Sequence, residues 1–317
     1  MGDLRGFYKG VNLGGWMSQC DYSEQRLDRF ITEADFAQIA AWGFDHVRLP
    51  VDYNVIRNPD GSSREEGLRR IDRALASCRR NGLNTVLDLH KTRGFSFDSR
   101  EGEQGFFSCE EDQAFFYGIW EELAARYAEH SDSLMFDLLN EMTDPGYLPT
   151  WESISGECIR RIRQYAPEVR ILIGGYNNNS VGAVPDLPAP LDGKVVYNFH
   201  CYEPHSFTHQ GAWWEVEERD ISERISFADS GVSADYFETL FEPAVRKART
   251  EGTALYCGEY GVIDVVPPEE ALGWLRAIHA AFEEYGIARC LWSYREMDFG
   301  LTDRRMDAVR ETLLRIV

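Results

Sequence analysis

The segments SLMFDLLNE at residues 133–141 and TALYCGEYG at 253–261 each place a glutamate at or near the end of a strand-like apolar run. Short apolar runs bounded by turn residues are typical of buried strands. Six further runs continue the rhythm along the chain: FYKGVNLGG at 7–15, GFDHVRLP at 43–50, LNTVLDLH at 83–90, VRILIGG at 169–175, KVVYNFHCY at 194–202 and IARCLWSY at 287–294. The sequence therefore predicts eight strands, the number that closes a parallel barrel.

Amphipathic stretches of helical periodicity separate the predicted strands, and some of them begin or end at capping residues. Thr32 precedes one stretch and Gly82 follows the next, as helix caps require. We expect helices at about 32–42, 67–81, 110–130, 150–166, 235–250, 268–285 and 303–316. The segment 177–192 is predicted to be a loop with at most a short helix, and 203–234 an elaborated loop.

Alternating strands and helices also occur in doubly wound sheets. That architecture binds nucleotides through a GxGxxG motif after its first strand, and the motif is missing here. The chain also lacks an obvious linker, low-complexity tract or internal repeat. The sequence therefore favours an α/β fold in which residues 1–317 form a single catalytic (β/α)8 (TIM) barrel domain.

The composition of the chain disfavours some classes of binding partner. Its 53 acidic and 33 basic residues give a formal net charge of −20, which repels phosphate backbones and anionic membrane surfaces. No apolar run approaches a membrane span, and the N-terminal MGDLRGFYKG has no apolar signal-peptide core. We expect a monomer that binds neither nucleic acid nor membranes. It is expected to be cytoplasmic, or secreted if a leader was removed.

The sequence gives little sign of a metal or disulfide framework. Its seven cysteines are scattered without a CxxC pair, so we expect reduced thiols in the core. Neither an HExxH motif nor a calcium-binding loop is present. No cofactor and no metal are expected. One alternative stays open, in which His90 and His200 join the carboxylates as metal ligands.

Polar and aromatic residues stand where the predicted strands end, and in such barrels these ends form the active site. Glu141 comes just after the apolar MFDLL, where an unpaired charge would be costly to bury. It is therefore either functional or one half of an ion pair with Arg48. Two carboxylates far apart in sequence, Glu141 and Glu259, suit hydrolysis of a glycosidic bond. The set at the strand ends is Arg48, His90, Asn140, Glu141, His200, Tyr202, Glu259 and Trp292.

Seven strings spread over the barrel resemble those of glycoside hydrolase family 5: GVNLGGW at 10–16, HVRLP at 46–50, DLH at 88–90, LLNEM at 138–142, NFHCYEP at 198–204, GEYG at 258–261 and LWSY at 291–294. The resemblance implies a retaining β-glycosidase on a (β/α)8 barrel. It makes Glu141 the acid/base and Glu259 the nucleophile.

The same resemblance implies roles for the other residues at the strand ends. Arg48 and Tyr202 should hydrogen-bond the nucleophile. The cleaved sugar should be lined by His90, Asn140 and His200, with Trp292 stacked beneath it.

Retention requires one ionised and one protonated carboxyl group. A cation and a hydrogen-bond donor beside Glu259 would keep it charged. The charge of Glu259, together with partial burial, would raise the pKa of Glu141 so that it holds its proton.

The motifs resemble the glucan-cleaving members of the family, so we expect an endo-acting β-glucanase on mixed-linkage glucan, β-1,3-glucan or cellulose. An exo-β-1,3-glucanase and a mannan- or xyloglucan-cleaving enzyme are alternatives on the same barrel. Two other classes are less favoured. A non-catalytic sugar-binding barrel has no need of both carboxylates, and a phosphate-binding metabolic barrel would need a donor cluster after strands seven and eight. The aromatic residues whose roles stay open are Trp16, Tyr53, Phe95, Phe107, Tyr176, Trp213 and Trp214.

Overall fold

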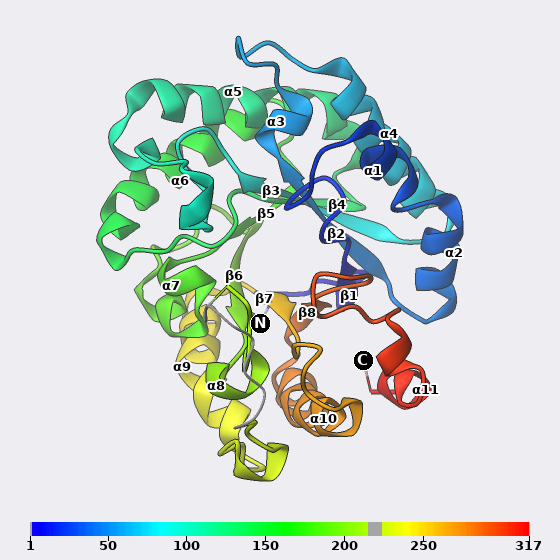
Figure 1. Cartoon of the computed structure of the whole chain (residues 1–317). Helices are drawn as coiled ribbons and strands as arrows, with labels where there is room; N and C mark the ends of the chain where they lie inside the picture. The colour runs from blue at the N-terminus through cyan, green and yellow to red at the C-terminus, as the bar shows by residue number, and fades with distance from the viewer. Residues whose placement is uncertain (1, 215–223, 317) are drawn as a thin grey trace.

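The computed structural model describes residues 2–214 and 224–316, and its centre is a closed barrel of eight parallel strands in chain order (Figure 1). All eight predicted strands are present. Their bounds are β1 Lys9–Asn12, β2 His46–Asp52, β3 Asn84–Lys91, β4 Leu134–Asp137, β5 Arg170–Ile173, β6 Val195–Cys201, β7 Leu255–Tyr260 and β8 Ala288–Leu291. The predicted (β/α)8 barrel is therefore confirmed.

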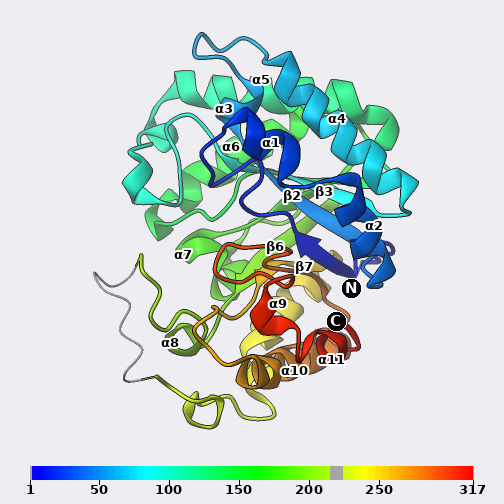
Figure 2. The same cartoon turned by 45° about the vertical axis from the view of Figure 1, so that its right-hand side comes forward.

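Helices form an outer layer around these strands, as the turned view makes clear (Figure 2). The larger ones lie where the sequence predicts them: α2 Glu33–Ala41, α4 Glu65–Arg80, α5 Glu110–Tyr127, α6 Leu148–Ile162, α9 Tyr236–Glu251 and α10 Pro268–Tyr285. The short helices α1 Glu24–Arg29, α3 Tyr53–Ile56, α7 Tyr176–Asn179 and α8 His205–Thr208 add to them.

The predicted helix at 303–316 is shorter than expected. A 3-10 turn at Arg304–Met306 comes first, and α11 then covers Arg310–Leu314. The segment 177–192 contains the end of α7 and a 3-10 helix at Val181–Asp186, which agrees with a loop and a short helix. In the predicted loop 203–234, the structure has α8 and a 3-10 turn at Phe227–Asp229, while residues 215–223 lie outside the described part.

The base of the barrel interior is apolar. A buried cluster fills it, made of Leu4, Phe7, Val86, Met135, Leu172, Val196, Ala254, Tyr256, Ala288 and Cys290. The imidazole of His46 lies beside Tyr256, with 2.8 Å between its Nε2 and the phenol oxygen. Gly10 leaves room for this ring, since a Cβ there would come within 2.2 Å of it. A second and larger cluster packs the helices against the outside of the strands.

Two expectations from composition can be compared with the described residues. All seven cysteines are free thiols, five of them buried and Cys20 and Cys109 half-buried. Among the helices that the structure describes, none has the length and apolar character needed to cross a membrane.

Candidate active site

Arg48 is the centre of the polar cluster at the carboxyl ends of the strands. It extends from β2, is completely buried, and donates to Glu259 Oε1 over 2.7 Å and to Asn140 Oδ1 over 2.9 Å. Asp88 and Asp137 also lie within 3.1 Å and 3.0 Å of its guanidinium group. Burial alone would lower the pKa of Arg48, but the three carboxylates outweigh burial and raise it well above its usual value.

The carboxylate of Glu259 is held by two donors on different oxygens. Arg48 bonds Oε1, and the hydroxyl of Tyr202 donates to Oε2 over 3.0 Å. Hydrogen bonds from a guanidinium cation to a carboxylate are charge-assisted and strong. Glu259 can approach the other strands closely because Gly258 precedes it. A Cβ at Gly258 would lie 2.7 Å from Asn198 Oδ1 and 3.0 Å from His200 Nε2.

Glu141 has different neighbours. His200 Nδ1 lies 2.8 Å from its Oε1, and the amide of Asn178 donates to its Oε2 over 3.1 Å. The alternative prediction, that Glu141 forms an ion pair with Arg48, is wrong. The buried arginine pairs with Glu259, Asp88 and Asp137 instead. The partners of Arg48 come from β1, β3, β4 and β7, so its contacts depend on the register of several strands.

Burial raises the pKa of Glu141, against the opposing effects of the Asn178 hydrogen bond and of the charges of His90 and Arg48. The direction agrees with the sequence argument. The leading cause is burial rather than the charge of Glu259 that the argument also invoked. The two glutamates are both buried but differ in their partners: Glu259 is paired with a cation, and Glu141 lies beside neutral donors.

The two histidines at the mouth are both buried. Burial lowers the pKa of His200 to about 3, so its ring is neutral at pH 7 and carries one proton. Burial also lowers the pKa of His90, whose Nδ1 lies 2.7 Å from Asp88 Oδ2. The ring of His90 is parallel to that of Trp292, with 5.9 Å between the centroids. His90 and Trp292 therefore form a stacked pair at one side of the cluster.

Glu141, His200 and Glu259 form the group of possible metal ligands within the described residues, because one ligand atom from each lies within 4.8 Å of the others. His90 is not part of this group. Arg48 already places a positive charge 2.7 Å from Glu259, which disfavours a second cation there. The separation of less than 4.8 Å between oxygens of Glu141 and Glu259 also brings both carboxyl groups within reach of one glycosidic bond.

Several polar residues that support the cluster were not singled out from the sequence. Asn12 accepts from Arg48 and donates to the backbone oxygen of Gly258 over 2.9 Å. Asn198 donates to Asp137 over 3.0 Å and accepts from the Gly258 amide. These residues and Asp88 are polar positions in otherwise apolar strands, and a polar residue in such a strand is a sequence signal that could have identified them.

Asn178 had no such signal. It follows β5, and its backbone has a left-handed φ of 55°. The backbone amides of Asn177 and Asn178 donate to the carbonyls of Thr143 and Met142, just beyond Glu141. This contact between two loops carries the Asn178 side chain to the carboxylate.

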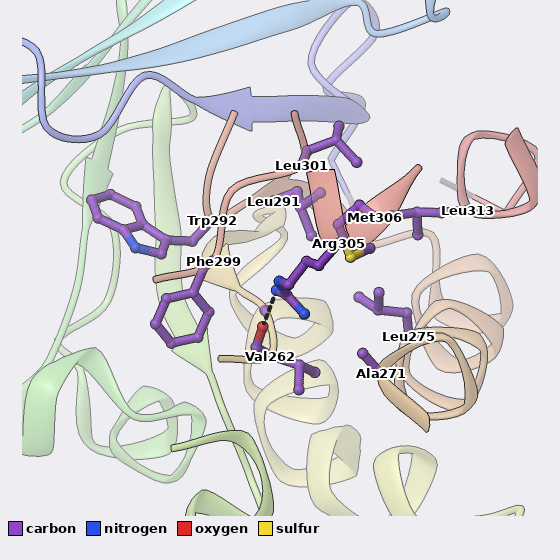
Figure 3. A pocket seen from close by; sticks show the side chains of 11 residues that line it. Val262, Ala271, Leu275, Leu291, Trp292, Phe299, Leu301, Arg305, Met306 and Leu313 are labelled. Atoms are coloured by element: carbon purple, nitrogen blue, oxygen red, sulfur yellow. Dashed lines mark hydrogen bonds between the residues drawn. The ribbon is translucent and has the colours of Figure 1, made fainter. Parts of the chain in front are cut away.

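The space behind Trp292 is a small cavity of about 20 Å³ (Figure 3). It is lined mainly by apolar side chains, and Arg305 crosses it to donate to the backbone oxygen of Val262 over 3.2 Å. A space of this size holds about one water molecule. It therefore belongs to the packing behind Trp292 and is too small for a sugar ring.

Five of the aromatic residues whose roles the sequence leaves open have different surroundings in the structure. Trp16 is buried, and its indole N–H donates to the Leu27 carbonyl over 2.8 Å, which makes it a core residue. Tyr53 donates to Glu103 over 2.6 Å. Phe95 and Phe107 pack edge to face at 5.4 Å. Tyr176 hydrogen-bonds Asp186 over 2.5 Å.

Comparison with known proteins decides the family. The sequence profile "Cellulase (glycosyl hydrolase family 5)" matches residues 7–298. The chain belongs to glycosyl hydrolase family 5. This family 5 chain is 56% identical over 287 residues to Cellodextrinase A of Ruminococcus flavefaciens, with 90% of this chain and 84% of that protein covered. It is 34% identical to Endoglucanase C of Acetivibrio thermocellus, with 98% of each covered.

Solved structures agree with the barrel fold. The cellulose synthase subunit Z of Clostridioides difficile has a TM-score of 0.83 and 25% identity, with 98% of this chain and 99% of that chain covered. A hyperthermophilic endo-β-1,4-glucanase solved with substrate has a TM-score of 0.83 at 22% identity, covering 98% and 97%, which supports the fold alone. The chain is thus a glycosyl hydrolase of the endo-β-glucanase type, and its substrate class is β-glucan.

Proposed function

We propose that this family 5 enzyme cleaves β-glucosidic bonds with retention of configuration, with Glu259 as nucleophile and Glu141 as acid/base. The observation that carries the proposal is the contrast between the two carboxyl groups. Glu259 is bonded by Arg48 and Tyr202, whereas burial raises the pKa of Glu141. Retaining glycosidases need this division of roles.

In the first step, a carboxylate oxygen of Glu259 attacks the anomeric carbon of the bound sugar. The bond from this carbon to the glycosidic oxygen breaks, and that oxygen takes the proton of Glu141. The products are a glycosyl ester on Glu259, a shortened sugar chain with a new hydroxyl group, and an ionised Glu141.

In the second step, Glu141 acts as a base. It accepts a proton from water, whose oxygen attacks the anomeric carbon as the ester bond to Glu259 breaks. Glu259 leaves as a carboxylate and Glu141 is protonated again. Two inversions at one carbon restore the original β configuration.

Two buried polar atoms beside the carboxylates support binding of a sugar there. The Nδ2 of Asn140 and the Nε2 of His200 have no hydrogen-bond partner among the described residues. Unpaired buried groups are costly, and sugar hydroxyls would pair with both. Trp292 and His90 form a stacked pair at the mouth, where the family resemblance expects the sugar platform.

We further propose that the substrates include soluble β-1,4-linked gluco-oligosaccharides. The support is the 56% identity to a protein named Cellodextrinase A. Mixed-linkage β-1,3-1,4-glucan contains the same β-1,4 bonds and is the natural polymer for comparison.

A proton NMR time course on cellotetraose and on mixed-linkage glucan tests the proposal, because it follows the anomeric signal of new chain ends. We expect the β-anomer to appear first. Early α-anomer would contradict double displacement. No product from either glucan, with β-1,3-glucan or mannan cleaved instead, would contradict the substrate assignment.

A further inference from the structure

Trp213 contacts two loops other than its own. It lies after α8, in the segment that follows β6, and the guanidinium carbon of Arg100 sits 4.8 Å from the centre of its ring. Its indole N–H donates to Asp298 Oδ2 over 3.1 Å. Arg100 belongs to the 3-10 turn Ser99–Glu101 after β3, and Asp298 follows β8. Three loops thus meet at one indole.

The barrel order shows that these contacts cross the mouth. Strand β6 neighbours β5 and β7, whereas β8 is two strands away and β3 is three. Loops that merely followed the rim would touch the loops of adjacent strands. The Arg100–Trp213–Asp298 bridge therefore joins walls that the barrel itself holds apart.

Both supports of the bridge are anchored. Asp98 accepts from Arg100 Nε over 2.8 Å and from Nη2 over 2.5 Å. The neighbouring Glu101 is tied to Lys91, at the end of β3, over 3.0 Å. On the other side, the backbone oxygen of Asp298 accepts from the Asp264 amide over 2.7 Å. The Arg100 guanidinium and the Asp298 backbone thus each have a further contact besides Trp213.

A chain of aromatic rings connects the bridge to the carboxylates. Trp213 packs on Trp214 at 5.6 Å, Trp214 on His209 at 5.9 Å, and His209 on Tyr202 at 4.8 Å between centroids. The hydroxyl of Tyr202 then bonds Glu259 over 3.0 Å. The bridge is therefore connected through ring contacts to Tyr202, which bonds the proposed nucleophile.

Trp213 stays 54% exposed in spite of these contacts. A large indole is usually well buried, so exposure combined with two fixed polar contacts needs an explanation other than core packing.

We propose that the Arg100–Trp213–Asp298 bridge selects short soluble β-glucan chains over the interior of long polymers. A long chain settles sideways into an open groove, and a bridge between loops two and three strands apart obstructs that approach. A short chain can enter lengthwise beneath the bridge. This inference rests on the proposed function, because it concerns substrates of the same two carboxylates.

The test compares kcat/KM for cellotetraose with kcat/KM for mixed-linkage glucan in the wild type, Arg100→Ala, Trp213→Ala and the double variant. We expect the polymer-to-oligosaccharide ratio to rise roughly three- to tenfold in the double variant, with smaller rises in the single variants, as loss of two exposed contacts permits. Tyr165→Ala is the matched control. This tyrosine is 46% exposed and lies between α6 and β5, at the base of the barrel.

An unchanged ratio in the folded double variant would overturn the bridge. It would also be overturned if Trp213→Ala weakened cellotetraose cleavage while Arg100→Ala changed nothing, because Trp213 would then be a simple sugar platform. A wild type inactive on both glucans would overturn the proposed function and the bridge together. Cellotetraose cleavage by the wild type with an unchanged ratio would overturn the bridge alone.

Discussion

The two ends of the barrel interior are built from the same strands but have opposite chemistry. On β3, Val86 faces the apolar base, and Asp88 and His90 face the mouth. On β4, Met135 is followed two residues later by Asp137. Inward positions alternate along a strand, so one step of two residues separates core from active site. A barrel can thus keep much of its stability at one end while it concentrates charge at the other.

The mouth carries a charge imbalance that the base does not. One buried cation, Arg48, faces the carboxyl groups of Asp88, Asp137 and Glu259. Burial raises the pKa of Asp88 to about 7, and it raises that of Asp137 to about 7 as well. The base contains mainly side chains whose burial is favourable. The difference between the ends predicts which substitutions affect activity and which affect stability alone.

The largest effect is expected for Glu259→Gln. It removes the nucleophile while keeping the size of the side chain, so kcat should fall about 1,000-fold or more. Rates of reducing-sugar release from mixed-linkage glucan, with thermal unfolding as the folding control, measure this loss. An unchanged rate would contradict the nucleophile assignment.

Glu141→Gln is the matched variant at the other carboxyl group. It should lose activity on natural glucans but keep the first step on an aryl glycoside whose leaving group needs no proton. Equal losses on both kinds of substrate would contradict the acid/base role.

The next effect compares the two ends directly. Arg48→Met leaves buried carboxylates unpaired, and Phe7→Ala leaves a cavity in the apolar base. Each should lower the free energy of unfolding by about 3–5 kcal/mol. Urea unfolding and kcat/KM of the folded fraction check this pair. We expect Phe7→Ala to keep its kcat/KM and Arg48→Met to lose it. Equal retention by both would contradict the claim that the mouth governs activity and the base governs stability alone.

The sequence predicts the scaffold better than the details of the mouth. The eight strands follow from local apolar runs, and the residues at their ends follow from the barrel rule. The neighbours of Glu141 do not, because they depend on register and on loops. Asn178 sits in a run of three asparagines that signals a loop, and its contact with Glu141 needs the structure. Trp16 is similar: the motif does not say whether it faces the cleft or the core.

A smaller effect is expected at Asn178. Its hydrogen bond works against the burial that raises the pKa of Glu141, so Asn178→Ala should raise this pKa further. The alkaline limb of the kcat/KM profile should therefore move to higher pH. The variant leaves unchanged the charged or titratable groups that interact with Glu141, namely His200, Glu259, His90, Arg48, His205, Asp88 and Tyr202.

Asn177→Ala is the control for this variant. Its φ of 51° imposes the same left-handed strain, and its backbone rather than its side chain is bonded to Thr143. An alkaline limb that does not move in Asn178→Ala, or that moves equally in both variants, would contradict a direct effect on Glu141.

The remaining effect is a pH dependence of stability. The folded pKa of Asp88, about 7, lies above its ordinary value of 3.8, so the folded state binds this proton more tightly. The stabilisation that protonated Asp88 gives the folded state is complete below about pH 4 and is lost as the pH rises to about 7. Asp88→Asn should therefore gain stability relative to the wild type across this window. Urea unfolding at several pH values measures the difference, and a constant or shrinking difference would contradict the charge imbalance at the mouth.

The most direct test of the central claim is covalent trapping at the mouth. A 2-deoxy-2-fluoro-β-cellobioside with a good leaving group slows the second step more than the first, so a glycosyl ester accumulates. Peptide mass spectrometry of the trapped protein locates the sugar. We predict a single adduct on the peptide that contains Glu259, absent from Glu259→Gln. An adduct on Glu141, or cleavage of the probe with no adduct on either glutamate, would contradict the account.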